Sequence, residues 1–227
     1  MKLRILVGSL LVWGSFPGWA MPGIGALALS GGRSFCAFSP FLNRSEKIEE
    51  SASFQVKKGD RKADAEQLAR ALDYFSSEKF HECLVLLQPL NRRYKLNPRY
   101  RAYLAVCLYY EWEYAEAIRL FDEVIPQLQG LAPHELSLYY WMDAESYFAL
   151  QQYDRALPLY EKMLPLCRDN EKPDAYYRMG FCHLFAEERK KAKECFELSL
   201  EGYLKYRNTP KEKARIAQIR HMIGGLK

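Results

Sequence analysis

Residues 105–126 read AVCLYYEWEYAEAIRLFDEVIP and contain four aromatic side chains within six residues. Ala105 is followed three positions later by Leu108, and Ala117 is followed four positions later by Phe121. Residues three and four apart share a helix face, so each pair combines a small residue with a large apolar one on the same side. The stretch therefore predicts two helices that approach each other closely at the small residues.

The same pattern occurs four times along the chain. The predicted second helices open with KFHECLVLLQPL, EYAEAIRLFDEV, QYDRALPLYEKM and ERKKAKECFELS. Their small residues are separated by 34, 39 and 36 positions, and they are Cys83, Ala117, Ala156 and Ala192. A second small residue always lies 12 positions earlier, at Ala71, Ala105, Ala144 and Gly180. A period of this length predicts helix pairs that stack on their neighbours and share a continuous core.

These positions resemble the tetratricopeptide repeat over residues 62–204. The second and third copies match best, whereas the fourth has Arg189 and His183 where the family carries aromatic side chains. The resemblance implies an all-α, right-handed α-solenoid of about four antiparallel helix pairs, followed by a C-terminal capping helix. We expect the solenoid over residues 61–204, with repeats at about 64–97, 98–131, 137–169 and 173–206.

A basic capping helix and tail are predicted over residues 207–227. Thr209 would be the N-cap, Pro210 would occupy the first turn, and Gly224 would end the helix. The residues expected to face inward are Ala214, Ile216, Ile219 and Ile223. From residue 205 to the end there are seven bases and one acid, which indicates either a solvated face or a contact with an acidic partner or an anionic membrane surface.

The N-terminus has the pattern of a secretory signal over residues 1–28. Two basic residues precede the apolar run ILVGSLLVW, and the next charge is Arg33. The alternatives are an uncleaved membrane anchor, or a true start at Met21. A signal would place the protein outside the cytoplasm, in the periplasm or cell envelope. Residues 29–60 are expected to form an extended or loosely ordered lead-in.

No pattern in the chain indicates an enzyme. It lacks a phosphate-binding glycine loop, a nucleophile elbow and an HExxH motif. Its four His have no metal-binding spacing on one helix face, so we expect neither a metal nor a cofactor. The six Cys are interpreted as buried thiols, with at least one disulfide as the alternative in an exported chain. The net charge of +5 is too mild to suggest nucleic acid as a partner.

The resemblance also implies a binding surface, because the first helix of each repeat lines a concave groove in that family. Some relatives hold a partner's C-terminal carboxylate there with a clamp of two Lys and two Asn. That clamp is missing, since the matching positions are Leu68, Leu72, Tyr103 and Met142. The groove positions instead form a mainly aromatic strip, which we call the first-helix strip: Arg99, Tyr109, Tyr110, Trp141, Glu145, Phe148, Tyr177 and Phe181. Leu138, Asp174 and Phe185 lie on the same side.

The function expected from this strip is that of a non-catalytic adaptor that binds a segment of another protein. Tyr110, Trp141 and Tyr177 would be the anchors, because Tyr and Trp offer rigid contact area with a polar tip, and Arg99 would bind an acidic group of the partner. One alternative is a cell-wall glycan-binding module, with sugar rings stacked on the same aromatics. Another is self-association or membrane docking through the basic tail. The strip could also be packing between adjacent helices, as expected for Tyr114, and Trp112 is expected to cover the end of its helix pair.

Overall fold

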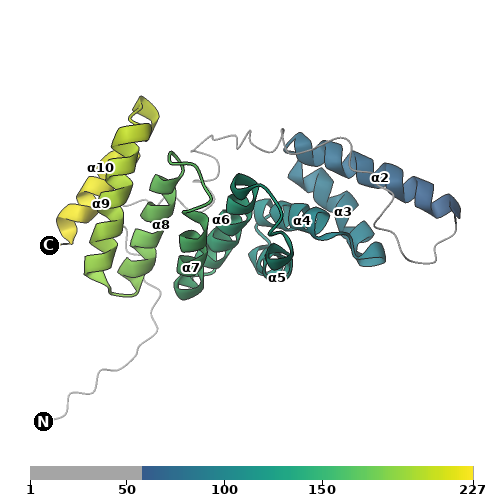
Figure 1. The fold of residues 1–227 in the computed structure, drawn as a ribbon, viewed down its shortest axis with the longest axis horizontal. Coiled ribbons are helices and arrows are strands. Elements are labelled where there is room, and N and C mark those ends of the chain that lie inside the picture. The colour runs from purple at the N-terminus through teal and green to yellow at the C-terminus, as the bar shows by residue number, and fades with distance from the viewer. Residues whose placement is uncertain (1–57, 227) are drawn as a thin grey trace, which may run out of the picture. The chain divides into compact units, whose positions relative to one another are not determined.

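The computed structural model describes residues 58–226, which are helical and contain no strand. Figure 1 shows the helices following one another along the chain. The nine α-helices of this region are α2 (Lys58–Ser76), α3 (Phe80–Tyr94), α4 (Pro98–Tyr110), α5 (Tyr114–Val124), α6 (Pro133–Ala149), α7 (Tyr153–Met163), α8 (Lys172–Phe185), α9 (Arg189–Tyr206) and α10 (Lys213–Gly225). Two short 3₁₀ helices, η3 (Ile125–Gln127) and η4 (Pro210–Glu212), precede α6 and α10. The predicted signal, and all but the last three residues of the predicted lead-in, lie outside the described residues. Those three residues, 58–60, were predicted to be extended or loosely ordered, but they form the start of α2.

The helices pack as successive pairs, α2 with α3, α4 with α5, α6 with α7 and α8 with α9. Each second helix also packs on the first helix of the next pair. The small residues that predicted this arrangement lie at the contacts, where Ala105 and Ala117 are fully buried. At Gly180 a Cβ atom would lie only 2.6 Å from the Phe196 ring, so a side chain there would collide with α9. The all-α solenoid is confirmed, and its close contacts depend on these small residues.

The same three-residue turn joins the two helices of every pair. Its middle residue has a positive φ, at Glu78 (58°), Trp112 (64°), Gln151 (60°) and Glu187 (61°). The residue after it donates its N–H to a carbonyl five positions back, for example Glu113 N–H to Leu108 O at 3.0 Å. This is the Schellman motif, whose left-handed position is usually glycine. So short a turn makes the paired helices antiparallel.

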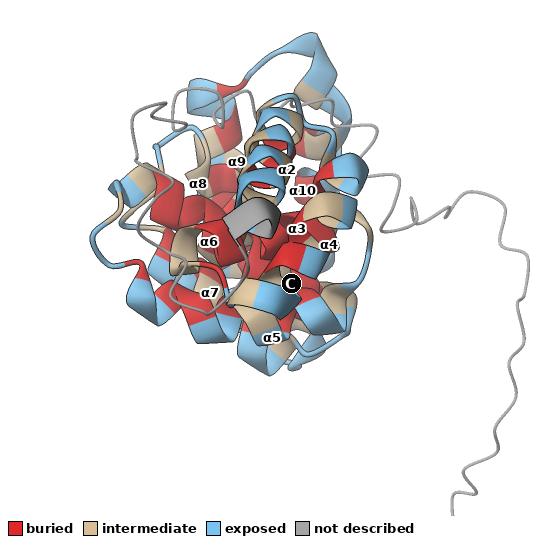
Figure 2. Cartoon of the chain, turned by 90° about the vertical axis from the view of Figure 1, so that its right-hand side faces the viewer, coloured by how far each residue is buried: buried red, intermediate tan, exposed pale blue. Residues whose placement is uncertain are grey.

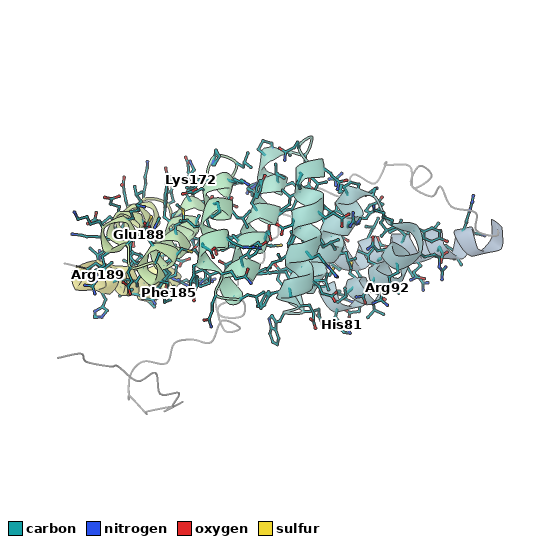
Figure 3. The ribbon with its side chains drawn as sticks, turned by 90° about the horizontal axis from the view of Figure 1, so that it is seen from below. His81, Arg92, Lys172, Phe185, Glu188 and Arg189 are labelled. Atoms are coloured by element: carbon teal, nitrogen blue, oxygen red, sulfur yellow. The ribbon has the colours of Figure 1, made fainter. Side chains whose placement is uncertain are left out.

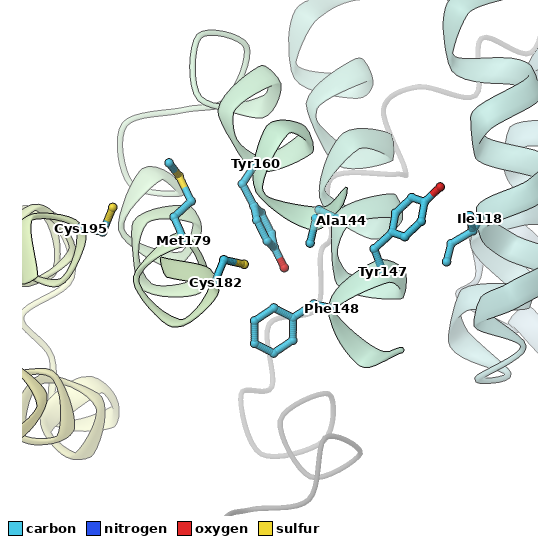
Figure 4. Close-up of a cluster of buried hydrophobic side chains, with 9 residues drawn as sticks. Ile118, Ala144, Tyr147, Phe148, Tyr160, Met179, Cys182 and Cys195 are labelled. Atoms are coloured by element: carbon cyan, nitrogen blue, oxygen red, sulfur yellow. The ribbon is translucent and has the colours of Figure 1, made fainter. Parts of the chain in front are cut away.

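The core runs between the layers of helices (Figure 2), and buried residues lie where helices face one another. One cluster, shown in Figure 4, joins α6, α7 and α8 through residues that include Ala144, Tyr160 and Met179. Of the five described cysteines, all are free and four are buried, Cys83, Cys107, Cys182 and Cys195. Burial raises the pKa of the Cys182 thiol to about 12, which makes it an unreactive core residue. Cys36 lies outside the described residues.

The capping helix α10 packs on α9 through Ile216 and Ile219, and Ile223 is partly buried. Three details of its prediction were wrong. Thr209 makes no side-chain cap, because η4 intervenes and delays the start of α10 to Lys213. Ala214 is exposed, because two residues before buried Ile216 it lies on the opposite face of the helix. The helix also continues through Gly224 to Gly225.

Candidate functional site

The first-helix strip lies on three helices, α4, α6 and α8, as predicted from the repeat positions. Its rings are close to one another or to neighbouring helices. The Trp141 ring lies edge-on to Tyr160 at 5.5 Å between centroids, and the rings of Tyr177 and Phe181 are 4.9 Å apart. Most of this surface is nevertheless packing: of its eight members, two are buried and six are partly buried.

The two buried members are Phe148, which was predicted to line the groove, and Tyr177, which was predicted as an anchor, and neither side chain is open to a partner. Phe148 is 8% exposed, because the Arg178 guanidinium lies over its ring at 4.6 Å and Tyr153 packs against its edge. Tyr177 is 5% exposed, and Arg215 of the capping helix lies 4.1 Å above its ring. Packing between adjacent helices, the alternative weighed for the strip, therefore accounts for both side chains.

The charged members of the strip are engaged in internal pairs. The Arg99 guanidinium donates to both oxygens of buried Glu135, at 3.3 and 3.1 Å, and the Tyr139 hydroxyl donates to the same carboxylate at 2.9 Å. The expected role of Arg99 in binding an acidic group of a partner is thus already filled within the chain. A buried carboxylate is stable only when it is paired and hydrogen-bonded in this way.

Glu145 is held in the same manner between two further helices. Its carboxylate accepts from Arg178 at 2.6 Å and from the Tyr160 hydroxyl. Burial alone would lower the pKa of Arg178, but the charge and hydrogen bond of Glu145, together with Tyr160 and Tyr109, outweigh burial and raise the pKa. The arrangement of one carboxylate with one Arg and one Tyr recurs twice more, in Asp174–Arg207–Tyr203 and Asp64–Arg93–Tyr94. These four trios join helices of the solenoid to one another.

Three solvent-exposed apolar side chains lie in the three-residue turns or directly beside them, along a line that we call the turn edge. Trp112 is 63% exposed, Phe185 48% and Leu150 40%, one at each of three consecutive pairs. The expectation that Trp112 covers the end of its pair was therefore wrong. Its backbone position explains the exposure, because Glu78, Gln151 and Glu187, at the same left-handed position of the other turns, are exposed too.

Stacked rings connect the turn edge to the outer members of the strip. Phe80 stacks on Tyr110 at 4.0 Å, which links the first turn to the second. Tyr153 stacks on Phe185 at 4.4 Å, which links the third turn to the fourth. Figure 3 shows His81 and Phe185 on the same side of the ribbon, with Lys172 on the other. The half-buried Tyr153 ring thus supports the exposed Phe185 ring.

Charge changes sign along the turn edge. Residues 111–116 carry three Glu and no base, whereas residues 187–191 carry two Glu followed by three bases. Glu111 accepts a hydrogen bond from His81 at 2.9 Å and raises the pKa of that imidazole. In the last turn Glu188 lies 2.9 Å from Lys191 and 2.6 Å from His183, and both interactions lower the pKa of Glu188.

Sequence reasoning missed the exposure of Trp112 and Leu150, although the segment EWE offered a signal. A Trp between two Glu at a helix end is poorly suited to a core position. Nothing in residues 61–226 brings together three His, Cys, Asp or Glu side chains that could hold a metal ion. Within residues 58–226, every helix is too short or too polar to cross a bilayer.

Comparison with solved structures finds helical repeat proteins. MamA from AMB-1 has a TM-score of 0.58 at 14% identity, over 73% of this chain and 85% of that chain. MamA from MSR-1 has a TM-score of 0.52 at 11% identity, over 73% and 99%. The apo form of RapI has a TM-score of 0.55 at 12% identity, over 72% and 62%. No protein-family model and no curated protein matches the sequence. At these identities the likeness concerns the fold, which is that of tetratricopeptide-type solenoids.

Proposed function

We propose that this protein is a non-catalytic adaptor that binds a segment of another protein along its turn edge. The observation that carries the proposal is the exposure of Trp112, Leu150 and Phe185 at three consecutive turns. Exposed apolar side chains that recur along one edge in this way are typical of a protein-interaction site. The half-buried strip residues Tyr109, Tyr110 and Phe181 would contribute their outer edges to it.

The proposal includes export to the cell envelope, which rests on the signal pattern of residues 1–28. A fusion of the full chain to alkaline phosphatase tests it, because that enzyme is active only after export. We expect activity from the fusion and none when Lys2 and Arg4 are replaced together with Leu6 and Leu10 by Glu. A second fusion, to a reporter that is active only in the cytosol, gives the converse test. Activity of that second fusion would contradict export, and it would leave the proposal of protein binding unaffected.

Glycan binding is less well supported. It needs exposed acids or amides beside the aromatics, and both acids that the sequence offered are engaged: Glu145 with Arg178, and Asp174 with Arg207. The basic tail is partly structural as well, because Arg207 also pairs with Glu212 and Arg215 covers Tyr177. Protein binding at the turn edge remains the function that the described surface favours.

The test is crosslinking followed by capture from the native cell. A triple variant, Trp112→Ala, Leu150→Ala and Phe185→Ala, is compared with the wild type. A matched control removes three exposed apolar side chains from the second helices, Val85→Ala, Leu198→Ala and Leu204→Ala. Circular dichroism first establishes that all three proteins are equally helical. We expect the control to retain partners that the first variant loses; equal recovery from both variants would contradict the proposal.

A further inference from the structure

Trp112 occupies a position that does not favour an indole ring. Its backbone lies in the left-handed region, φ 64°, which favours glycine and is costly for a bulky residue. The side chain is 63% exposed, and within residues 61–226 no ring or cation packs against it. The other turns carry Glu or Gln at the same position. Stability therefore does not explain a tryptophan here.

The surroundings of this ring are negatively charged. Glu111 and Glu113 flank it in the sequence, and exposed Glu116 follows one turn later on α5. Glu78 from the preceding turn reaches this region, because after burial its charge is the second cause that raises the pKa of Tyr110 to about 12. The last carbonyls of α4 add partial negative charge at the same place.

Two basic side chains of the neighbouring pair are already engaged. Lys79 lies over the Tyr74 ring at 5.8 Å, whereas His81 bonds at 2.9 Å to Glu111, which belongs to the acidic surroundings of Trp112. Arg119 lies on α5, more than one helical turn after Glu113, where it acts on Glu123. The Trp112 ring therefore combines an open aromatic face with an acidic rim, and tryptophan is the aromatic side chain that best attracts a cation.

We propose that Trp112, between Glu111 and Glu113, is the seat for an arginine or lysine side chain of a basic partner segment. This inference rests on the proposed function and specifies its ligand. The cation stacks on the indole face while Glu113 neutralises its charge, together with Glu111, which it shares with His81, and apolar residues of the same segment contact Leu150 and Phe185. Basic residues 189–191 repel cations at the far end of the edge, so the basic end of the segment lies at Trp112.

The experiment uses the full chain labelled with 5-fluorotryptophan, which gives one ¹⁹F signal for each of its four Trp. A Trp112→Phe variant assigns the signal of interest. Three acetylated decapeptides are titrated, with leucine alternating with arginine, with glutamine or with glutamate. We expect the arginine peptide to shift the Trp112 signal saturably, and the other two to bind at least about tenfold more weakly.

Variants separate the ring from the charges. Trp112→Ala is expected to weaken the arginine peptide about tenfold, and the double variant Glu111→Gln, Glu113→Gln about three- to tenfold with a smaller salt dependence. Gln151→Ala, at the same position of the next turn, is the matched control and should leave the affinity unchanged. For variants that lack the Trp112 ¹⁹F signal, isothermal titration calorimetry gives the affinity for the arginine peptide.

Three results would overturn the inference: equal binding of the glutamate peptide, undiminished binding by the double Gln variant, or no shift of the Trp112 signal with the arginine peptide. A Trp112 signal that shifts with protein concentration in the absence of peptide would mean that a second copy of the chain binds at Trp112. That result would overturn the inference as well. In each case the adaptor role stands if the triple Ala variant still loses its partners in the native cell, so the two proposals fail separately.

Discussion

The first-helix strip and the turn edge are both aromatic, but they have different physical roles. In the strip, rings lie under guanidinium groups and carboxylates are paired, as at Phe148, Arg178 and Glu145. At the edge, Trp112 has an open face and a strained backbone. The difference shows that aromatic content on the first helices does not by itself identify a binding surface. Exposure and unused interaction capacity do, and both are found at the turns.

The largest effect that would test this comparison is the removal of Glu145. Glu145→Leu leaves Arg178 buried without its carboxylate, and we expect a loss of about 3 kcal/mol in the free energy of unfolding. Adding Arg178→Met should recover a large part of that loss, because the pair is then replaced by apolar side chains. Urea denaturation followed by circular dichroism measures both. A loss below about 1 kcal/mol in the single variant would mean that the strip is not held by its buried pairs.

The next effect concerns the close contact beneath the strip. Gly180→Ala places a methyl group against the Phe196 ring, where the Cβ would be 2.6 Å away, and should cost about 1–3 kcal/mol. Gly224→Ala is the control, since nothing lies within 4 Å of a Cβ there and alanine favours the helix. Thermal unfolding distinguishes them. Equal melting temperatures for the two variants would contradict the close-contact explanation.

A pH-dependent effect distinguishes the interior of the solenoid from its edge. Asp143 is 1% exposed, and burial, reinforced by Asp122 and opposed by Lys162, raises its pKa to about 8. Between pH 4 and 8 the folded state therefore binds more protons at this group than the unfolded state does, and its contribution to stability falls as pH rises. Asp143→Asn should flatten this dependence and stabilise the protein by about 1–2 kcal/mol at pH 7. Urea unfolding midpoints at pH 5, 7 and 8.5 measure this dependence. If the midpoints of variant and wild type changed in parallel with pH, Asp143 would not be the cause.

The smallest effect is a gain in stability at the edge. Trp112→Gly relieves the left-handed backbone and should stabilise the fold by about 0.5–1 kcal/mol, even though it removes a large side chain. Gln151→Gly should do the same in the neighbouring turn. Melting temperatures compare the two, and partner capture should be impaired only at position 112. If Trp112→Gly lowered the melting temperature, the indole would be shown to support the fold. Trp112 would then be a packing residue, like the buried members of the first-helix strip.

The sequence allowed the architecture to be predicted because the small residues recur at fixed offsets, and Ala105, Ala144 and Gly180 lie where that spacing requires. The positions of the strip on α4, α6 and α8 followed from the same register. The surroundings of the strip residues could not be predicted from this register, because their ion pairs join residues that are far apart in the sequence. Glu145, for example, pairs with Arg178, 33 positions later. Local spacing carries no information about such contacts. The exposure of Trp112 depends on a backbone conformation that is normally inferred from glycine, which none of the four turns contains at that position.

Because the same turn recurs at successive helix pairs, the turn edge presents equivalent positions at regular intervals. Packed helices lie about 10 Å apart, so equivalent turns recur at about that interval along the edge. An extended peptide advances about 3.3 Å per residue. A segment lying along the edge would therefore meet one turn roughly every third residue, although the linkers of residues 125–132 and 164–171 are both longer than the linker of residues 95–97. Partner sequences should accordingly show their anchor residues at a spacing near three, beginning with the cation.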